Sequence, residues 1–438
     1  MTINAPTPIV IYEDFGWQRL LPLVYFRAAC QLRCGMALLH ERVARLIASQ
    51  SATTVPRLPQ LWCRPSLAGM VADQTQLATN DPISAGTLLV NGRGLWSRIP
   101  NVNPTDASWV GTTKNPESIA CIHADADLAA KLAPEILLDE LRLRATLAGL
   151  PRRDISQDVQ LFDWPWQIVL ANEQALLTDW EHARGQASIE GTIGPGAYLL
   201  NESSIHIGAG TRIKPCAVID AEDGPVWIGE NVTIMPHCYV QGPAYIGSGS
   251  LLQPGAAVHE GTSIGPRSKV GGEIEGSIIQ GLSNKQHDGF LGHSYVGSWV
   301  NIAADCINSD LKNTYGTVRV PINGREVETG EMFVGMLVGD FSKAGINVSF
   351  PTGAVIGFCS SVFAARSPKF IPSFAWRDGD QNDRFDIKRG LVVAKKVMAR
   401  RQHTMTEHEE QVFRSVRQQA IAIELQPQME IESSGGRG

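Results

Sequence analysis

The sequence of 438 residues lacks the features that mark several large classes of protein. Its formal net charge is −6, so it has no basic surplus of the kind that dedicated nucleic-acid-binding proteins show. No apolar run approaches the ~20 residues that a membrane span needs. The N-terminus, MTINAPTPIVIYEDFGW, has no basic segment before its short apolar run, so no secretory signal is expected. These absences predict a cytoplasmic protein whose partners are neither nucleic acids nor membranes.

Paired cysteines are also absent. The 8 cysteines are scattered along the chain, and no two of them form a CxxC motif. Structural zinc sites and redox motifs need such paired spacing. We therefore expect reduced thiols, several of them buried, and no metal site built from cysteine.

A six-residue repeat is the strongest pattern that the sequence does contain. A period of six fits neither an α-helix nor a simple strand alternation, but it is typical of a parallel β-helix in which three hexads close one coil. We expect this fold from residue 189 to about residue 365, with the aliphatic residues inside and two excursions at Asp220–Trp227 and Asn308–Met332. The repeated aliphatic residues are Ile228, Ile234, Val240, Ile246, Leu252, Val258, Ile264 and Val270.

The two ends of the chain have other patterns. Short apolar runs such as PIVIYED and AGTLLVNGR alternate with helical stretches before the repeat, which predicts an α/β domain with a mostly parallel sheet. A Pro- and aromatic-containing connector and two helices follow the repeat, and the spacing of Thr404 and Glu407 predicts a capping box for the second helix. The expected domains are 1–185, 186–365 and, for the connector, C-terminal helices and disordered tail, 366–438.

This domain order resembles the GlmU family, which joins a uridyltransferase to a glucosamine-1-phosphate acetyltransferase. The stretches RLLPLVYFRAACQLRCGMALLHER, NKQHDGFLGHSYVGSWVNIAADCINSDLKNTYG and PKFIPSFAW are most similar to members described as sugar nucleotidyltransferases with a shortened N-terminal domain. The resemblance implies a left-handed β-helix, a homotrimer with active sites between neighbouring prisms, and acetyl-CoA as the acyl donor.

The repeat fails at NKQHDGFLGHSYVG, where two histidines occur. The resemblance places His287 at the position of the family's general base, and a base with a pKa near neutrality suits the attack of an amine on a thioester. The break is equally what a structural kink would produce. His293 lies six residues further on, so we expect it on the next face of the prism, as a hydrogen-bonded loop residue rather than a metal ligand.

The resemblance also implies residues that bind the acceptor. Glu273 matches a glutamate that binds substrate hydroxyls, and Asn301 matches an asparagine of the family's NIGAG segment. Asp310 stands where the family has an asparagine that contacts both the base and the substrate. These three residues and His287 make up the predicted acetyltransferase site.

The groups that hold the sugar phosphate in the family are replaced here. Charge-assisted contacts are the strong ones, so losing them should weaken the binding of a dianion severely. Lys285, Lys312 and Arg319 are the candidates to supply charge instead. The replacing residues are Gln253, Glu275 and Phe290.

The N-terminal domain lacks the glycine-rich GxGxR loop of sugar nucleotidyltransferases. Arg19, Arg27 and Arg33 follow the first predicted strand instead, and they form either a phosphate pocket or ordinary ion pairs with carboxylates. Where the family has a metal-binding aspartate, this sequence has Asn91 and Arg93.

Two residues are weak candidates for a Mg²⁺ site, should the N-terminal domain be active. Asn172 and Glu181 keep the spacing of a family segment in which the asparagine helps to hold the metal, although Asn172 also suits the start of a helix. Asp163 is a candidate carboxylate ligand.

The first C-terminal helix is basic. Its cations suit either a solvated helix face or contact with the phosphates of CoA. They are Lys388, Arg389, Lys395, Lys396, Arg400 and Arg401.

The sequence thus supports three functions. The first is acyl transfer from acetyl-CoA to a sugar amine, with His287 as base and backbone amides stabilising the oxyanion. The second is a sugar-1-phosphate nucleotidyltransferase of the UDP-N-acetylglucosamine pyrophosphorylase type in the N-terminal domain, with a sugar phosphate or nucleotide sugar as ligand. The third is a non-catalytic scaffold that binds nucleotide sugars.

Overall fold

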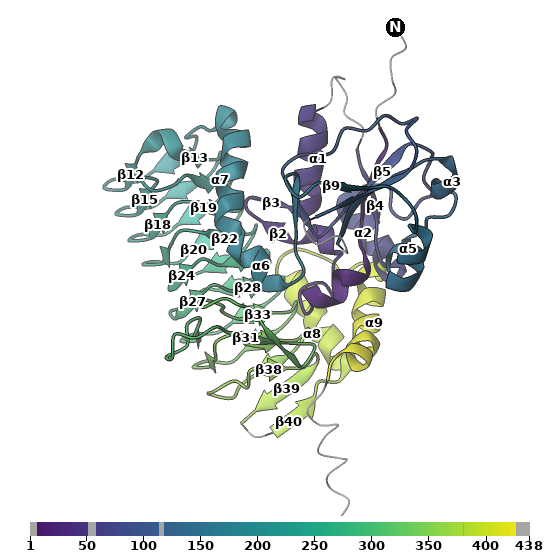
Figure 1. Cartoon of the computed structure of the whole chain (residues 1–438). Helices are drawn as coiled ribbons and strands as arrows, with labels where there is room; N and C mark the ends of the chain where they lie inside the picture. Colours follow the sequence, from purple (N-terminus) through teal and green to yellow (C-terminus); the bar gives the residue numbers. More distant parts are fainter. Residues whose placement is uncertain (1–6, 51–57, 114–117, 380, 426–438) are drawn as a thin grey trace, which may run out of the picture. The chain divides into compact units, whose positions relative to one another are not determined.

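A computed structural model describes residues 7–50, 58–113, 118–379 and 381–425 (Figure 1). The chain divides into two compact units. Unit 1 comprises Met1–Leu20, Phe26–Leu32 and Ala37–Asp163, and unit 2 comprises Leu21–Tyr25, Arg33–Met36 and Trp164–Gly438. Unit 2 therefore begins before residue 186 and also includes two short segments from the N-terminal part of the chain.

Unit 1 contains a six-stranded sheet in the order β4-β1-β5-β8-β7-β9. Strand β1 runs parallel to β4 and β5, β7 runs parallel to β9, and β8 runs antiparallel to both its neighbours. The nucleotidyltransferase-like α/β fold is confirmed, with a sheet that is mixed rather than uniformly parallel. The strands are β1 (Ile9–Tyr12), β4 (Gln60–Trp62), β5 (Thr87–Asn91), β7 (Trp109–Thr112), β8 (Ile119–Ala124) and β9 (Arg152–Asp154).

Five α-helices and one small strand pair accompany the sheet in the described part of unit 1. Strands β5 and β8 are buried along their whole length, so the core lies between the sheet and its helices. The helices are α1 (Leu39–Gln50), α2 (Ala68–Thr75), α3 (Ala126–Ala129), α4 (Pro134–Leu137) and α5 (Glu140–Thr146). The small pair is β6 (Gly94–Trp96) with β10 (Val159–Leu161). Two further strands of two residues each are β3 (Ala37–Leu38) in unit 1 and β2 (Arg33–Cys34) in unit 2.

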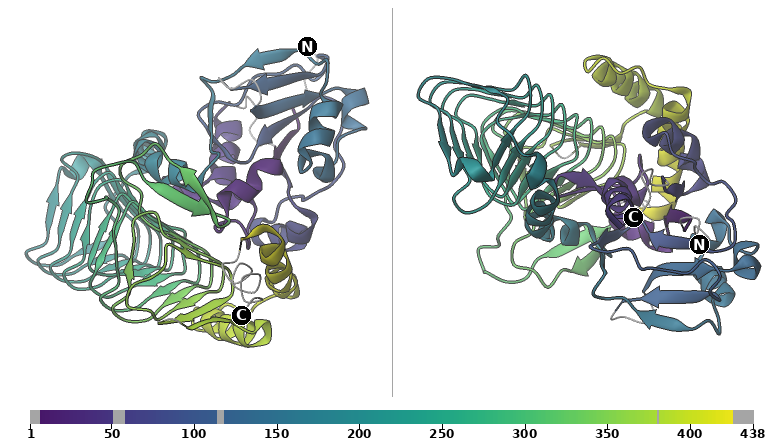
Figure 2. Two further views of the ribbon diagram at one scale, coloured as in Figure 1. Left: turned by 60° about the horizontal axis from the view of Figure 1, so that its bottom comes forward. Right: turned by 90° about the horizontal axis from the view of Figure 1, so that it is seen from above.

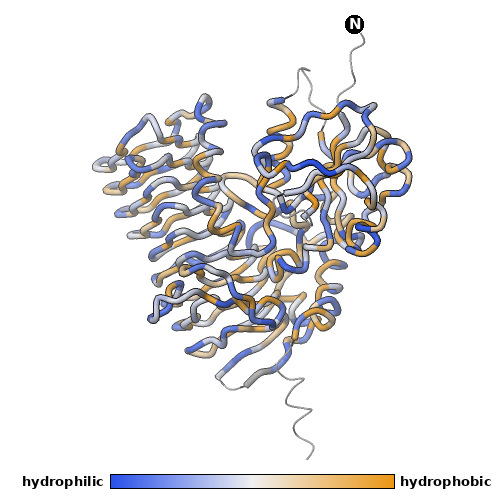
Figure 3. Tube along the Cα trace, in the orientation of Figure 1, coloured by the Kyte–Doolittle hydropathy of each residue, from blue (hydrophilic) through white to orange (hydrophobic). Residues whose placement is uncertain are grey.

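Unit 2 is built on the predicted parallel β-helix, whose stacked coils are clear in Figure 2. Its three faces are three sheets whose strands pair in parallel, apart from β40 at the end of one of them, which is antiparallel to its neighbour. Aliphatic residues from every coil fill the interior. Apolar and polar residues alternate within each coil (Figure 3), because inward and outward side chains alternate along a strand.

Face 1 is the sheet that matters most for function. It contains β11 (Thr192–Ile193), β14 (Arg212–Ile213), β17 (Thr233–Ile234), β20 (Leu251–Leu252), β23 (Lys269–Val270), β26 (Asn284–Lys285), β29 (Asn301–Ile302), β34 (Lys343–Ala344), β37 (Ser361–Val362), β39 (Ala375–Asp378) and β40 (Gln381–Arg384).

Faces 2 and 3 complete the prism. Face 2 contains β12 (Tyr198–Leu200), β15 (Val218–Asp220), β18 (Tyr239–Gln241), β21 (Ala257–Val258), β24 (Glu273–Glu275) and β27 (Phe290–Gly292), with β30 (Ile307–Asn308) and β35 (Ser349–Phe350) paired beyond them. Face 3 contains β13 (Ile205–Ile207), β16 (Val226–Ile228), β19 (Ala244–Ile246), β22 (Thr262–Ile264), β25 (Ile278–Ile279), β28 (Tyr295–Val296), β33 (Leu337–Val338), β36 (Val355–Ile356) and β38 (Phe370–Ile371).

The coils differ in length at the places where the sequence repeat breaks. On face 1, Leu252 pairs with Val270, 18 residues later, but Val270 pairs with Lys285, only 15 residues later. The coil that leads to NKQHDGFLGHSYVG is therefore three residues short. The second predicted excursion contains a hairpin of β31 (Arg319–Ile322) and β32 (Arg325–Glu328).

The C-terminal part of unit 2 differs from the prediction in two ways. Strands β38 and β39 continue the solenoid past residue 365, so part of the expected connector is a further coil. The predicted Thr404–Glu407 capping box is wrong: Thr406 caps α9, accepting a hydrogen bond from the Glu409 amide, while the Glu409 carboxylate accepts one from the Thr406 amide.

Four α-helices accompany the solenoid in the described part of unit 2. Two of them precede it, α6 (Pro165–Leu170) and α7 (Asn172–Ala183). The other two, α8 (Ile387–Ala399) and α9 (Glu407–Ile423), follow it and contact each other. Helix α9 packs on the solenoid through an aromatic cluster that includes Phe341 and Phe413, whose ring centroids are 5.4 Å apart.

The sequence also predicts reduced thiols, several of them buried, and no membrane-spanning segment. All 8 thiols are free, and only Cys216 is exposed. Within the described ranges, the helices are too short or too polar to cross a membrane.

Candidate functional site

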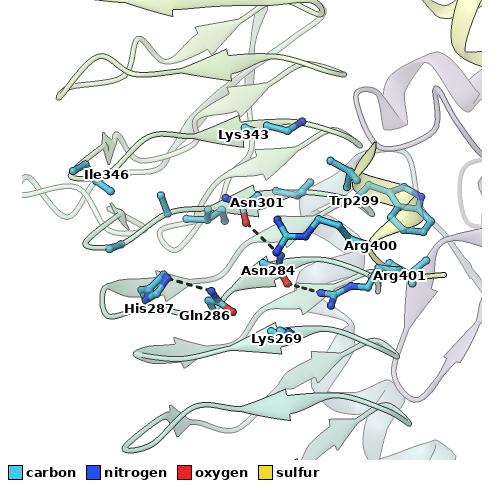
Figure 4. A pocket seen from close by; sticks show the side chains of 16 residues that line it. Lys269, Asn284, Gln286, His287, Trp299, Asn301, Lys343, Ile346, Arg400 and Arg401 are labelled. Carbon is cyan, nitrogen blue, oxygen red and sulfur yellow. Dashed lines mark hydrogen bonds between the residues drawn. The ribbon is translucent and has the colours of Figure 1, made fainter. Parts of the chain in front are cut away.

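A cavity of about 460 Å³ lies on face 1, where the C-terminal end of α8 meets the solenoid (Figure 4). Four consecutive strands of face 1 contribute to its wall: β23, β26, β29 and β34. The labelled polar residues that line it are Lys269, Asn284, Gln286, His287, Asn301, Lys343, Arg400 and Arg401. We call it the face 1 pocket.

The face 1 pocket is cationic. Four of its lining side chains are Lys or Arg, and none of the lining residues is Asp or Glu. The Arg401 guanidinium donates to Asn284 Oδ1, and the Arg401 carbonyl accepts from Arg267. Burial, together with the nearby guanidinium groups of Arg267 and Arg400, lowers the pKa of Arg401. Cations held together without carboxylates favour an anionic ligand.

Local packing brings these cations together. Arg400 and Arg401 follow α8 directly, and His403 beyond them packs against Trp299 with ring centroids 5.7 Å apart. Lys343 lies on β34, where burial lowers the pKa of its ammonium and Phe341 O accepts its hydrogen bond at 2.9 Å.

Two predicted site residues meet in the face 1 pocket. His287 lies in the corner between β26 and β27, with its side chain exposed and its Nε2 3.3 Å from the Gln286 amide nitrogen. Asn301 lies on β29, and its Oδ1 accepts a hydrogen bond from Asn284 Nδ2 at 3.3 Å. A histidine and an asparagine therefore share one cavity with the four cations.

Lys285, a predicted substrate-binding residue, lies inside the prism instead. Its residue is 1% exposed, and its Nζ donates to Gly271 O at 3.0 Å and to His287 O at 2.5 Å. The shortened coil turns its side chain inward, so Lys285 does not line the face 1 pocket.

Asp310 and Glu273 are engaged elsewhere. Asp310 Oδ2 accepts a hydrogen bond from His293 Nδ1 at 2.8 Å, and the His293 ring packs 5.2 Å from that of Phe333. His293 is in the corner between β27 and β28, so the two histidines occupy different corners, as expected. Glu273 is half exposed on face 2, with an oxygen 3.5 Å from His259 Nε2.

The excursion beyond β30 holds the other predicted cations. Lys312 Nζ donates to the Thr317 carbonyl, and Arg319 pairs with Glu328 at 3.1 Å. Both contacts are exposed, so they are weak ones. Neither residue lines the face 1 pocket.

Unit 1 has its own cluster of charges, at the carboxyl ends of its parallel strands β1, β4 and β5. Ligands of open α/β sheets bind at such edges. Here Glu13 accepts hydrogen bonds from Arg64 at 2.9 Å, and Asp14 accepts two from Arg93 at 2.7 Å each. All four residues are at least 94% buried. The edge is filled by pairs from its own chain.

Arg93 is the centre of this cluster. It also donates to Phe162 O at 2.6 Å and to Asp163 at 3.2 Å, and Asn91 Nδ2 donates to Asp14 at 2.9 Å. Burial alone would raise the pKa of Asp14, but the charge of Arg93 and these hydrogen bonds hold it below its ordinary value.

The three arginines predicted to bind phosphate do not form one open pocket. Arg19 pairs with Asp163 at 2.8 Å, and Arg27 is buried within unit 1. Arg33 belongs to unit 2, where its side chain donates to Gln280 O and Met36 O. The guanidinium of Arg33 therefore donates its hydrogen bonds to backbone carbonyls.

The predicted Mg²⁺ ligands do not fit a metal site. Asn172 is fully buried, and its amide exchanges hydrogen bonds with Gly35, Gly261 and Ser263. Asp163 accepts from Arg19 and Arg93, so cations already neutralise it. Among the described residues, no cluster of three or more His, Cys, Asp or Glu side chains could hold a metal.

Sequence reasoning missed Lys269 and Lys343 as lining residues, and for Arg400 and Arg401 it left open a solvated helix face or contact with CoA phosphates. The available signal was the outward position just before each inward aliphatic residue on face 1, which both lysines occupy. Nothing in the sequence indicated that the end of α8 returns to that face.

Family models match both parts of the chain. Residues 9–187 match the sugar nucleotidyl transferase model, and residues 225–259 match the bacterial transferase hexapeptide model. The sequence is 30% identical to the bifunctional protein GlmU of Acidithiobacillus ferrooxidans, over 39% of this chain and 34% of that protein. It is 34% identical to GlmU of Methanococcus aeolicus, over 44% of this chain and 40% of that one.

These matches are partial. The chain spans about a third to two-fifths of the length of the curated relatives it matches. A solved LpxA from Acinetobacter baumannii is 15% identical over 49% of this chain and 77% of its own, with a TM-score of 0.25, so the fold assignment rests on the strand pairing itself. By its nucleotidyltransferase-family domain, its hexapeptide repeats and its GlmU relatives, the chain fits a GlmU-like family.

Proposed function

We propose that the face 1 pocket is the site of acyl transfer from acetyl-CoA to an amino sugar. The observation that carries this proposal is the convergence of His287 and Asn301 with four cations in one cavity that has no carboxylate in its lining. The names of the curated relatives, which include a sugar-1-phosphate nucleotidylyltransferase/acetyltransferase from Sulfurisphaera tokodaii, support the reaction class.

His287 is the proposed base. It takes a proton from the sugar amine as the nitrogen attacks the thioester carbon and the C–N bond forms. The C–S bond then breaks, and the imidazolium gives its proton to the leaving sulfur, so that CoA leaves as its thiol. Its imidazole is exposed, so an acceptor can reach it.

The cations give the pocket its preference for phosphorylated ligands. Lys269, Arg400 and Arg401 would pair with the phosphates of the acyl donor or of a sugar phosphate. They are an alternative to the family's phosphate-binding residues, which are replaced here by Gln253 and Glu275.

His293 is the rival base within unit 2. Asp310 Oδ2 lies 2.8 Å from its Nδ1 and orients the ring, as a carboxylate partner does for a general base. Mutation of each histidine in turn therefore decides which of the two is the base.

The test is CoA release measured with a thiol reagent, using acetyl-CoA and a panel of amino sugars, their 1-phosphates and their nucleotide derivatives. We expect turnover with at least one acceptor and a loss of about 100- to 10,000-fold in His287→Ala. His293→Ala is the matched control. Loss only in His293→Ala would move the base to the other corner, and no turnover with any acceptor would overturn the proposal.

The nucleotidyltransferase alternative is weaker, because the edge of unit 1 where a nucleotide would bind is filled by Glu13–Arg64 and Asp14–Arg93. Pyrophosphate release that depends on Mg²⁺ would support it. Binding of nucleotide sugars without either reaction would support the scaffold alternative.

We further propose that the protein acts in the cytoplasm and that it is a homotrimer. Analytical ultracentrifugation would test the oligomeric state.

A further inference from the structure

Lys285 occupies a place in the fold where a charge is costly. The residues paired along face 1 place an inward side chain in every coil, and this position holds lysine where its neighbours along the column are aliphatic. Removing an ammonium group from water costs several kcal/mol unless polar partners replace the water. The paired inward residues are Ile213, Ile234, Leu252, Val270, Lys285, Ile302, Ala344 and Val362.

The partners of this ammonium group are two backbone carbonyls. One belongs to Gly271, in the preceding coil, at 3.0 Å, and the other belongs to His287, at 2.5 Å. The Gly271 amide in turn donates to the Lys285 carbonyl at 2.7 Å, which ties the two coils together on both sides. The ammonium therefore joins the preceding coil to the backbone of the residue whose imidazole lines the face 1 pocket.

The side chain of His287 has few other restraints, whereas the backbone after it is held by hydrogen bonds from the Asp305 amide to Asp288 O at 3.1 Å and from the Glu273 amide to Gly289 O at 3.2 Å. The imidazole is exposed, and its only hydrogen bond that the structure shows is to the Gln286 side chain. Gly289, two residues later, has a φ of +124°, a conformation that side chains other than glycine rarely adopt. Position 287 therefore depends on its backbone contacts for its orientation.

We propose that Lys285 is a positioning residue for His287: by holding the His287 carbonyl from inside the prism, it fixes the direction in which the imidazole enters the pocket. This inference rests on the proposed acyl transfer. An inward aliphatic residue would pack the core at least as well but could not hold a carbonyl. The presence of lysine at this position is therefore explained by its contact with the His287 carbonyl and not by packing of the core.

The surroundings of the ammonium agree with this assignment. Burial lowers the pKa of Lys285 to about 8, against the opposing effects of the Cys306 thiol and the carboxylates of Asp288 and Asp305. Cys306 is itself occupied, since its Sγ donates to Gly345 O at 2.9 Å. No carboxylate competes with the two carbonyls for the ammonium among the hydrogen bonds that the described residues make to it.

The first experiment compares Lys285→Met with Leu252→Met, which places the same side chain in the inward column two coils earlier, away from Gly271 and His287. Both changes roughly conserve side-chain volume. We expect Lys285→Met to fold, to keep its KM for acetyl-CoA within about threefold, and to lose roughly 100-fold in kcat, the size of effect that a misplaced catalytic group produces. Leu252→Met should keep its kcat. A kcat for Lys285→Met equal to that of Leu252→Met would overturn the proposal.

Hydrogen–deuterium exchange separates this proposal from the proposed function. Peptides covering 284–292 should exchange faster in Lys285→Met than in wild type, while those covering 239–246 should not change. If wild type shows no acyl transfer, the proposed function is wrong, but the exchange result still tests whether Lys285 positions His287. If wild type is active and exchange in 284–292 is unchanged in Lys285→Met, the positioning role of Lys285 is contradicted and the proposed function is not.

A second variant covers the case in which Lys285→Met does not fold. Lys285→Gln is shorter and neutral, so it should also release the corner. If neither variant folds, a pH series on wild type remains: exchange in 284–292, relative to 239–246, should rise above pH 8 as the ammonium loses its charge. A constant ratio from pH 7 to pH 9 would contradict the proposal.

Discussion

The two charged sites of this protein contain similar residues but differ in how their charges are matched. At the strand ends of unit 1, Arg64 and Arg93 each face a carboxylate of the same chain, and all four groups are buried. In the face 1 pocket, the lining cations meet carbonyls, an amide and solvent, with no carboxylate in the lining. The first arrangement is complete without a ligand, whereas the second gains from an anion. Matched charges indicate structure, and unmatched charges of one sign indicate binding.

The largest effect we expect is on stability, at the centre of the unit 1 cluster. Arg93→Met leaves Asp14 buried without its partner, which should cost about 3–5 kcal/mol in the free energy of unfolding. Urea denaturation followed by circular dichroism measures this. Arg98→Met is the control, because Arg98 pairs with Asp158 with its own side chain 67% exposed. Equal losses in the two variants would remove the distinction between the two sites.

The next effect concerns ligand affinity in the face 1 pocket. Lys269→Glu introduces a carboxylate among the pocket cations, so the affinity for CoA should fall by at least tenfold, since a hydrogen bond to a charged group contributes about 1.5–3 kcal/mol. Isothermal titration calorimetry at two salt concentrations measures it, and Lys388→Glu, on an exposed part of α8, provides the control. Unchanged affinity in Lys269→Glu would show that the pocket is not an anion site.

The pH dependence of stability sharpens the comparison at the carboxylate side. The folded state holds the pKa of Asp14 below its ordinary value, so the stabilisation by this group is present above pH 3.8 and is lost as pH falls through the folded pKa. The difference in unfolding free energy between wild type and Asp14→Asn should therefore be constant near neutral pH and shrink below pH 3.8. A difference that does not depend on pH would mean that Asp14 is not held as an anion.

The smallest effect lies at the rim of the same cluster. Arg19 and Asp163 pair at 2.8 Å, but their side chains are 38% and 35% exposed. Arg19→Ala should cost no more than about 1 kcal/mol in the free energy of unfolding. If wild type binds a nucleoside triphosphate and Arg19→Ala does not, the hypothesis that this arginine binds phosphate is supported instead.

The solenoid was predictable because its coils repeat locally. Each aliphatic residue from Ile228 to Val270 lies inside, as the period required. The period then fails: counting six from Val270 leads to Gly276 and Leu282, whereas the chain turns Lys285 inward, because the coil is three residues short. A period cannot predict its own interruption, so from the sequence Lys285 is predicted as a candidate phosphate-binding cation and not as an inward residue.

The candidate sites were predictable only where they are local in sequence. His287 and Asn301 are close along the chain and occupy neighbouring coils, so the resemblance could place both. Arg401 reaches Asn284 across more than a hundred residues, and Arg93 meets Asp14 across nearly eighty. Such pairings depend on how helices and strands return to one another, and neither composition nor spacing records that.

The single exposed thiol can be labelled to measure the oligomeric state. Of the 8 cysteines, Cys216 alone is exposed, and it lies in a corner of a rigid coil, where a label would report the position of the backbone rather than its own motion. A maleimide spin label should therefore modify one site per chain without mutagenesis. In a cyclic trimer, pulsed electron resonance would then give one distance between three equivalent labels, and a monomer would give none.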